Sequence, residues 1–374
     1  MDKRIKIIYV TCALEVGGAE KFLLDLLTRL DRSRFEPILA TVIGAGKLEN
    51  DFKALNIPLH IFGRRRVRYW SGVAQFCQLF RLFKKEKPTI VHTQLFAADF
   101  WGRLAAKAAG VPIIVTTEQN INADQSWLRE FLKKSTYRFC DGAVAISNAV
   151  KKYMMKKYGV PEGKIEIIPN DVDVAALEKK LEKAPPRNPD KKIILTVGRL
   201  TPQKGQDYLL KALAMLPRCE LWLAGEGPLE KKLRGLAKNL KIEERVKFLG
   251  VRSDIPELLS QADLFVFPSL WEGLGIAVLE AAVAKVPIVA SKIDGILDII
   301  KDRESGLLVE PKDAAGLAKA TEEILANPQK SRERAEKACD WVKQNFDIKI
   351  VTRQYERVYE KLILKKKYAN SSNQ

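Results

Sequence analysis

Short runs of β-branched and other apolar residues recur along the first half of the chain, separated by stretches with helical periodicity. Each run is nearly continuous in apolar character, which is typical of a strand buried on both faces of a parallel sheet. The intervening segments 19–30 and 99–110 have helical spacing. The runs are IKIIYV (5–10), PILATVI (37–43), TIVHT (89–93), PIIVTTE (112–118), GAVAIS (142–147) and KIEIIP (164–169).

The alternation stops at residues 177–192, where charged residues, three prolines and an asparagine predict a linker or domain edge. It restarts with KIILTVG (192–198), ELWLAG (220–225), RVKFLG (245–250), DLFVFP (263–268), VPIVAS (286–291) and GLLVE (306–310). From Asp313 onward the pattern is helical and charged. The sequence therefore predicts two α/β domains, each a doubly wound parallel sheet, at residues 1–175 and 188–350. Residues 351–374 are predicted to form a helix that packs back on the first domain, and a polar tail.

Composition excludes several classes of protein. The chain has 374 residues, 47% of them hydrophobic and 29% charged, which is typical of a globular protein. No apolar run reaches the length of a membrane-spanning helix, and residues 5–14 fit a first buried strand better than a signal peptide. Five scattered cysteines without a CxxC pair argue against a disulfide scaffold or structural zinc and suit a reducing cytoplasm.

The net charge of +18 is concentrated in the first half of the chain. Residues 1–187 contain 32 Lys and Arg against 20 Asp and Glu, which gives +12 for this half. Such an excess indicates an anionic partner. Nucleic acid, a membrane surface and phosphorylated substrates all remain open at this point.

Two loops that follow predicted strands have a composition suited to phosphate. In 15-EVGGAE-20, Gly17 and Gly18 open a helix and let backbone N–H groups approach a ligand, or they serve only a tight turn. The loop lacks the GxGxxG spacing of a dinucleotide site. In 196-TVGRLTPQKG-205, Arg199 and Lys204 precede a helix. They suit a diphosphate, and the alternative is two solvated charges.

Two glutamates stand in an otherwise apolar stretch, 269-SLWEGLGIAVLEAAVAKVPIVAS-291. An unpaired buried carboxylate is costly, so Glu272 and Glu280 need partners. With Glu272 in a loop and Glu280 on the next helix, both can line one cleft and accept hydrogen bonds from ligand hydroxyls. Gly273 and Gly275 leave the N–H groups of the helix N-terminus accessible to an anion. The alternative is structural, with Glu272 capping the helix and Glu280 paired with a core arginine.

These motifs together resemble glycosyltransferase family 4. The resemblance runs from GGAE through VAIS, IPNDVD, VGRLTPQKG, AGEGPLE and KFLG to ADLFVFPSLWEGLGIAVLEA and GLLVEPKD, which is nearly the whole chain. Glu272 and Glu280 match the E-x7-E signature of that family. The resemblance implies the GT-B fold, in which two Rossmann-like domains face each other across a cleft, and a retaining enzyme that uses nucleotide-sugar donors.

The resemblance also implies roles for single residues. Glu272 would bind hydroxyls of the donor sugar and Glu280 those of the ribose, while Arg199 and Lys204 would neutralise the leaving diphosphate. Leu274 and Gly275 would offer backbone donors, and Gly17 and Gly18 would let the first domain approach the donor. The first domain would then bind the acceptor, a glycan or a lipid-linked sugar, and the second the donor, with a UDP-sugar favoured over a GDP-sugar.

The chain departs from its relatives at three positions. Many relatives have a histidine after the fifth strand and a second within HTH, where this chain has 116-TTEQN-120 and 92-HTQ-94. Gln119, with Glu118 beside it, is therefore the candidate acceptor-side residue, and Gln119 can donate a hydrogen bond but cannot titrate. The two histidines, His60 and His92, lie elsewhere. Lys285 stands where relatives usually have glycine.

No metal or cofactor is expected, because the sequence has no DxD diad in a suitable loop and no cluster with ligand spacing. Two carboxylates would also fit a glycoside hydrolase, which does not need the paired cations or two Rossmann-like arrays. An epimerase or a phosphorylase on the same double fold is the main alternative. A nucleic-acid-binding protein is a remote one, because the basic clusters lie away from the glutamate loop.

One basic segment suggests where the enzyme works. Residues 62–87 hold eight basic residues and one acid, interleaved with aromatic side chains. A helix from Ser71 would pack its aromatic side on the sheet. The preceding cluster is not needed for that packing and suits anionic lipid headgroups. We therefore expect peripheral binding to the inner face of the cytoplasmic membrane through Arg64, Arg65, Arg66, Arg68 and Trp70.

Overall fold

The computed structural model of the protein describes residues 4–371 except 64–70, 122–125, 186 and 188–191. The chain divides into two compact units. Unit 1 comprises residues 1–170 and 348–374, and unit 2 comprises residues 171–347. Each unit contains its own parallel sheet, one of seven strands and one of six, so the prediction of two doubly wound α/β arrays is confirmed.

The sheet of unit 1 has the strand order β3-β2-β1-β4-β5-β6-β7, and every pairing is parallel. Six strands correspond to the predicted apolar runs. The edge strand β3 was missed because it has only three residues and none of them is fully buried. The strands are β1 (Ile5–Thr11), β2 (Phe35–Thr41), β3 (Leu59–Ile61), β4 (Ile90–Gln94), β5 (Ile113–Glu118), β6 (Gly142–Ala145) and β7 (Ile165–Ile167).

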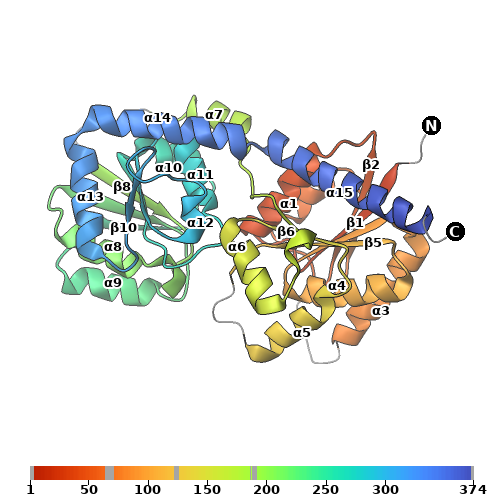
Figure 1. Cartoon of the computed structure of the whole chain (residues 1–374). Helices are drawn as coiled ribbons and strands as arrows, with labels where there is room; N and C mark the ends of the chain where they lie inside the picture. The colour runs from red at the N-terminus through yellow and green to blue at the C-terminus, as the bar shows by residue number, and fades with distance from the viewer. Residues whose placement is uncertain (1–3, 64–70, 122–125, 186, 188–191, 372–374) are drawn as a thin grey trace. The chain divides into compact units, whose positions relative to one another are not determined.

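Two helical layers cover the sheet of unit 1 (Figure 1). In one layer α4 packs between α3 and α5, and in the other α1 lies against α15. Val351, Tyr355 and Tyr359 of α15 join the apolar core formed by the sheet and α1. The helices are α1 (Gly18–Arg29), α2 (Glu49–Ala54), α3 (Ser71–Glu86), α4 (Phe96–Ala109), α5 (Trp127–Tyr137), α6 (Asn148–Tyr153), the π-helical η1 (Met154–Tyr158), the 3-10 turn η2 (Glu162–Lys164) and α15 (Ile348–Ser371).

The sheet of unit 2 has the order β10-β9-β8-β11-β12-β13, again parallel throughout. Its strands are β8 (Lys192–Val197), β9 (Cys219–Ala224), β10 (Val246–Gly250), β11 (Leu264–Phe267), β12 (Ile288–Ser291) and β13 (Leu307–Val309). Its helices are α7 (Val174–Leu181), η3 (Pro202–Lys204), α8 (Gln206–Ala214), α9 (Glu230–Asn239), η4 (Glu243–Arg245), α10 (Ile255–Gln261), α11 (Ile276–Val283), α12 (Asp294–Leu297), α13 (Ala314–Ala326) and α14 (Pro328–Asn345).

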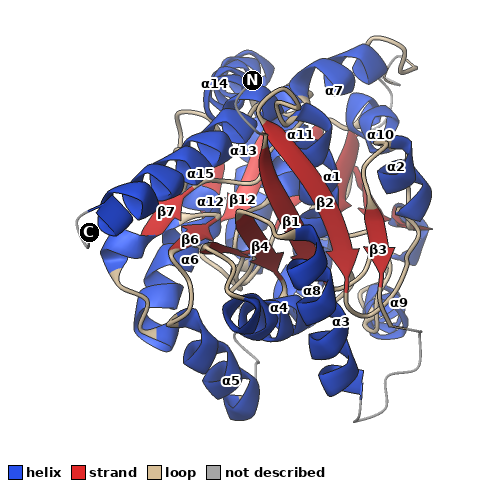
Figure 2. Ribbon diagram, turned by 90° about the vertical axis from the view of Figure 1, so that its right-hand side faces the viewer, coloured by secondary structure: helices blue, strands red, loops and turns tan. Residues whose placement is uncertain are grey.

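Figure 2 separates helices from strands by colour and shows strands β1, β2 and β3 of unit 1 side by side. The helices begin and end where the local chemistry favours it. Ser147 and Asp173 accept hydrogen bonds from backbone N–H groups at the starts of α6 and α7. Gly110 ends α4 in the left-handed conformation that glycine adopts at low cost.

The boundary between the units differs from the predicted linker. Unit 2 begins at Asp171, so the start of segment 177–192 belongs to helix α7 rather than to a connection. Val174 and Leu177 of this helix are buried, and α7 packs on α10 and α11. The charged residues of the segment concealed a short apolar face. The chain returns to unit 1 at Ile348, at the start of α15.

Candidate active site

The loop after β8 holds Lys204 near the end of β11. Gly205, which ends the 3-10 turn η3, has φ +60°, and a Cβ there would lie 2.2 Å from the carbonyl oxygen of Pro268. Only glycine allows this approach without a shift of the backbone. The Leu270 N–H donates to the Gln203 carbonyl at 2.7 Å, and the Gln203 side chain donates to the Trp271 carbonyl at 2.9 Å. The two loops are thus fastened together.

Lys204 and Glu272 form an ion pair in this arrangement. Lys204 Nζ lies 2.5 Å from Glu272 Oε1, and the two side chains are 18% and 8% exposed. The ammonium also lies 4.7 Å from the centroid of the Phe267 ring, a cation–π contact. Glu272 therefore has the partner that its burial requires. Its contact is with a lysine of another loop, which differs from the helix capping that the structural alternative predicted. Sequence reasoning identified both residues but not their contact.

Arg199 lies in the same loop but is exposed. Within the part of the chain that the structure describes, no carboxylate forms an ion pair with it. The Gln206 side chain donates to the Arg199 carbonyl at 3.0 Å, so the backbone is fixed while the guanidinium extends into solvent. This loop therefore supplies one cation held by a carboxylate and one that is available to an anion.

The turn 224-AGEGPLE-230, one of the motifs that carry the family resemblance, supports the Arg199 loop. The Gly198 and Leu200 N–H groups each donate at 2.9 Å, to the carbonyls of Ala224 and Glu226. A Cβ on Gly225 would lie 2.1 Å from the Gly198 carbonyl oxygen. The glycines of this turn thus allow two loops of unit 2 to lie directly against each other.

Leu274, Gly275 and Glu280 occupy the start of α11. Gly275 precedes the helix, and a Cβ there would lie 2.7 Å from Ile296 Cδ1. Leu274 is buried, so its side chain belongs to the core and only its backbone can serve a ligand. Glu280 lies one turn into the helix and is partly exposed. Lys204, Glu272 and the α11 N-terminus are brought together locally, and Glu280 follows them along the helix.

Lys285, just beyond α11, has φ +53°. A residue with a Cβ is strained by about 1–2 kcal/mol in this left-handed conformation, whereas glycine is not. The structure thus gives the physical reason why glycine is common here in relatives. The difference between Lys285 and the glycine of relatives therefore concerns the backbone conformation at the end of a helix.

In unit 1, Gln119 belongs to a chain of amide side chains. It donates to Gln94 Oε1 at 3.4 Å and accepts from Asn170 Nδ2 at 3.0 Å. Gln94 is buried and also donates to Thr11 Oγ1 at 3.3 Å and to the Ala19 carbonyl at 3.4 Å, in the first turn of α1. The α1 turn that begins at Gly17 and Gly18 is thus connected to Gln119. The sequence motif 92-HTQ-94 was the available signal for Gln94.

Glu118, in contrast, is enclosed in a buried ionic cluster. Its Oε2 lies 2.5 Å from Lys133 Nζ and accepts a hydrogen bond from Tyr137 Oη at 2.9 Å. Lys133 also lies 3.3 Å from Asp99 Oδ2, and Asp99 Oδ1 lies 3.2 Å from Arg103. All four charged side chains are at most 3% exposed and their charges balance. Glu118 is therefore held as part of the packing between β5, α4 and α5.

The two histidines have structural surroundings. His92 is buried between Tyr359 Oη at 2.7 Å from Nδ1 and Thr117 Oγ1 at 2.8 Å from Nε2, and burial lowers its pKa to about 3. It remains neutral and ties β4 and β5 to α15. His60 is partly buried, and burial lowers its pKa as well. Among the described residues, no group of three or more His, Cys, Asp or Glu side chains is arranged to hold a metal.

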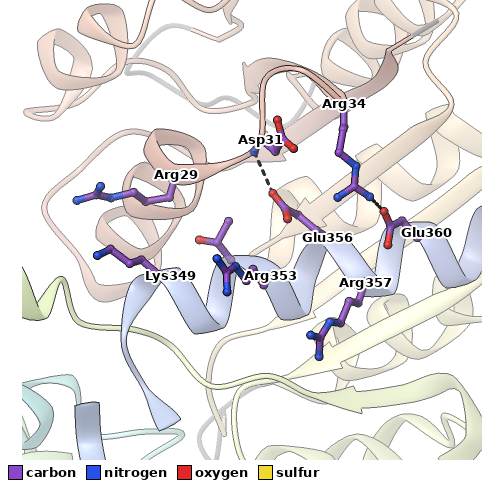
Figure 3. A pocket seen from close by; sticks show the side chains of 9 residues that line it. Arg29, Asp31, Arg34, Lys349, Arg353, Glu356, Arg357 and Glu360 are labelled. Atoms are coloured by element: carbon purple, nitrogen blue, oxygen red, sulfur yellow. Dashed lines mark hydrogen bonds and ion pairs between the residues drawn. The ribbon is translucent and has the colours of Figure 1, made fainter. Parts of the chain in front are cut away.

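A groove of about 480 Å³ lies elsewhere in unit 1, between the end of α1 and helix α15 (Figure 3). Arg34 pairs with Glu360, and Glu356 accepts from the Asp31 N–H at 2.9 Å. Its lining contains none of the residues that the sequence indicated. It is lined by Arg29, Asp31, Arg34, Lys349, Thr352, Arg353, Glu356, Arg357 and Glu360.

The predicted membrane segment is described at residues 62–63 and from Ser71 onward. Arg64, Arg65, Arg66, Arg68 and Trp70 lie outside the described residues. Helix α3 buries Leu79 and Phe83, while Phe76 and Phe80 are partly exposed and stack on each other with ring centroids 6.1 Å apart. No described helix is long and apolar enough to cross a bilayer.

Two family models match consecutive parts of the chain. Residues 16–176 match the family described as Glycosyltransferase Family 4, and residues 178–341 match Glycosyl transferases group 1. The chain belongs to glycosyltransferase family 4. As a member of this family it is a retaining glycosyltransferase with the GT-B fold.

Curated relatives include enzymes that act on lipid-linked sugars. The chain is 28% identical to the UDP-Gal:α-D-GlcNAc-diphosphoundecaprenol α-1,3-galactosyltransferase of Escherichia coli, over 83% of this chain and 85% of that enzyme. It is 27% identical to the GalNAc-α-(1->4)-GalNAc-α-(1->3)-diNAcBac-PP-undecaprenol α-1,4-N-acetyl-D-galactosaminyltransferase of Campylobacter jejuni, over 86% and 89% of the two chains.

Solved structures of this glycosyltransferase fold superpose closely. HepE of Anabaena in complex with UDP-glucose has a TM-score of 0.83 at 23% identity, with 96% of this chain and 100% of that chain covered. Sucrose-phosphate synthase of Thermosynechococcus elongatus has a TM-score of 0.81 at 20% identity, with the same coverage. These likenesses establish the fold.

Proposed function

We propose that this glycosyltransferase moves a hexose from a UDP-sugar to a lipid-linked glycan in the synthesis of a surface polysaccharide, with retention and without a metal. The observation that carries the proposal is the Lys204–Glu272 pair, with Nζ 2.5 Å from Oε1 and the exposed Arg199 in the same loop. Curated relatives that use polyprenyl-diphosphate acceptors support the acceptor class.

The donor is bound by exchange of these contacts. A diphosphate attracts Arg199 and Lys204, and Glu272 then accepts hydrogen bonds from hydroxyls of the sugar. Glu280 binds the ribose, and the N–H groups of Leu274 and Gly275 face the phosphates. When the diphosphate replaces Glu272 at the Lys204 ammonium, the released carboxylate loses its cation and is compensated by hydrogen bonds from the sugar hydroxyls.

The reaction follows from these positions. The bond between the anomeric carbon and the diphosphate oxygen breaks, and the acceptor hydroxyl oxygen bonds to that carbon on the same face. The departing diphosphate oxygen takes the hydroxyl proton. Arg199, Lys204 and the N-terminus of α11 stabilise the charge that develops on the diphosphate, which is typically the largest contribution to such catalysis. Gln119, held by Gln94 and Asn170, donates a hydrogen bond on the acceptor side.

The test is transfer from a panel of UDP- and GDP-sugars to a polyprenyl-diphosphate-linked N-acetylhexosamine. We expect the wild-type enzyme to form a new α-linked disaccharide from a UDP-hexose, with or without a chelator. The Lys204→Ala enzyme should form none. Isomerisation of the donor without transfer would indicate an epimerase. Release of a sugar phosphate in the presence of inorganic phosphate would indicate a phosphorylase.

The site of action that we propose is the inner face of the cytoplasmic membrane, where lipid-linked acceptors and nucleotide sugars meet. The four arginines of 64–68 supply part of the attraction, about 1 kcal/mol each near an anionic surface. Changing all four to glutamine is expected to weaken sedimentation with anionic vesicles and to lessen its salt dependence. Binding that ignores both lipid charge and salt would refute this contribution.

A further inference from the structure

Helix α5 exposes large apolar side chains on the face turned away from its own unit. Trp127 is 77% exposed, Phe131 61% and Leu128 50%. At 100° per residue, Trp127 and Phe131 lie within about 40° of each other and Leu128 within about 60° of Phe131. These three residues form one continuous apolar surface over the first turn and a half of the helix, here called the α5 surface.

The opposite face of α5 already provides all the burial that the fold needs. Lys133, Thr136 and Tyr137 are buried against α4 and the sheet, within the ionic cluster of Glu118. A surface helix normally turns polar residues toward solvent, so an apolar outer face has no role in the packing of unit 1. Exposed apolar patches of this kind mark interaction sites. Within its helical layer α5 packs between α4 and the π-helical η1 (Figure 1).

Cations border the α5 surface. Lys134 and Arg138 are exposed and lie on the same side of the helix as Phe131. Arg129 is also exposed but lies about 160° from Phe131 around the helix, where its guanidinium is 5.3 Å from the centroid of the Phe96 ring, so it does not belong to this border. The acid of this helix, Glu130, is paired with Lys157 at 3.5 Å. The result is an apolar centre with a basic margin.

We propose that the α5 surface binds the interface of an anionic lipid bilayer, with Trp127, Leu128 and Phe131 inserted at the level of the headgroups and the cations against lipid phosphates. An apolar face with a basic border is the composition of an interfacial helix. A second copy of this chain is disfavoured as occupant because it would bring equal basic margins together. The inference deepens the proposed function, since it places a membrane-bound acceptor next to unit 1.

Vesicle sedimentation tests the proposal with the full-length enzyme. Wild type is expected to bind vesicles of phosphatidylcholine with about 30 mol% phosphatidylglycerol and to bind pure phosphatidylcholine weakly. The double change Trp127→Gln with Phe131→Gln should weaken binding at least tenfold. Val251→Gln, which removes a 54% exposed apolar side chain from unit 2, is the matched control and should bind as wild type.

Two further measurements distinguish lipid insertion from self-association of the enzyme. Brominated lipid should quench the tryptophan fluorescence of wild type more than that of Trp127→Phe. Light scattering without lipid should give the same mass for wild type and the double variant. The proposal would be overturned if the double variant bound vesicles as wild type does. It would also be overturned if wild type were a dimer and the double variant a monomer. Transfer to a water-soluble acceptor tests the proposed function separately, because vesicle binding requires neither donor nor acceptor.

Discussion

Two Lys–Glu pairs with the same contact distance have different surroundings in the two units. Lys133 Nζ and Glu118 Oε2 in unit 1, and Lys204 Nζ and Glu272 Oε1 in unit 2, each lie 2.5 Å apart. Glu118 also binds Tyr137, and Lys133 also contacts Asp99, all within a sealed cluster. Lys204 has its carboxylate, one aromatic face and a partly open side.

The comparison separates a structural ion pair from a candidate catalytic one. When a buried charge has several charged partners, its removal leaves at least one of those partners unpaired. That is strongly destabilising. A pair at the edge of two glycine-rich loops can exchange one partner for an anionic ligand. Burial alone does not distinguish the two pairs, since both glutamates are buried; the number of further partners and the access of ligand do.

The largest expected effect is on folding. Glu118→Gln removes one of the two carboxylates that contact Lys133. We therefore expect the free energy of unfolding of unit 1 to fall by about 3–5 kcal/mol. Glu272→Gln should cost less, because Lys204 keeps the Phe267 ring and partial access to solvent once the carboxylate is removed. Denaturant unfolding of both variants measures the two effects. Equal losses would remove the distinction between the pairs.

Next in size is the effect of Lys204→Ala on turnover. If Lys204 stabilises the departing diphosphate as proposed, its loss should lower kcat at least 100-fold, about 3 kcal/mol of charge stabilisation. The melting temperature should fall, because the buried Glu272 loses its partner, but the enzyme should remain folded at the assay temperature. Lys211→Ala, which removes another lysine of unit 2 whose ammonium lies over the Tyr208 ring, is the control and should retain full activity. A correctly folded Lys204→Ala enzyme with more than half the activity would show that the diphosphate is bound elsewhere.

A titration extends the comparison to a second buried group of unit 1. Because the pKa of His92 is about 3 in the folded protein and near 6.5 when unfolded, the unfolded state binds the extra proton as the pH falls. The contribution of the neutral imidazole to the free energy of unfolding is fully present above pH 6.5 and is lost progressively as the pH falls toward 3. Between pH 7 and pH 5 wild type should lose about 2 kcal/mol more than His92→Gln. Parallel pH profiles of unfolding would contradict this.

A smaller effect divides the two glutamates of unit 2. Glu280→Gln should weaken the binding of free UDP about tenfold, or about 1.4 kcal/mol, because it alters the proposed contact to ribose. Glu272→Gln should leave UDP affinity within threefold of wild type, or tighten it by releasing Lys204, while transfer falls sharply. Calorimetric titration with UDP provides the measurement. Equal weakening by both changes would refute separate contacts with ribose and sugar.

The smallest effect concerns the helix that carries Glu280. Lys285→Gly should stabilise the protein by about 0.5–1 kcal/mol, because relief of the left-handed strain exceeds the greater freedom of glycine in the unfolded chain. Transfer activity should not change. Thermal unfolding and an activity assay on the same preparation test both statements, and a loss of activity would indicate that Lys285 takes part in the reaction.

The sequence by itself determined the two parallel sheets and the family, and it indicated the two loops that hold Lys204 and Glu272 as a candidate donor site. Strands buried on both faces leave a local apolar record, and glycines and charges that follow them are visible as short motifs. The apolar patterns of the three-residue edge strand β3 and of the short helix α7 were too weak to be recognised in the sequence, and both elements were missed.

Tertiary structure alone decided which partners the charged residues have. Glu118 and Gln119 are neighbours in the chain, yet one is sealed in an ionic cluster and the other joins Gln94 and Asn170. The contact of Lys204 with Glu272 spans 68 residues and depends on Gly205 lying against the Pro268 carbonyl. Periodicity reports which face of an element is buried, whereas the role of a buried charge depends on which distant segments meet there and how many of them can satisfy it.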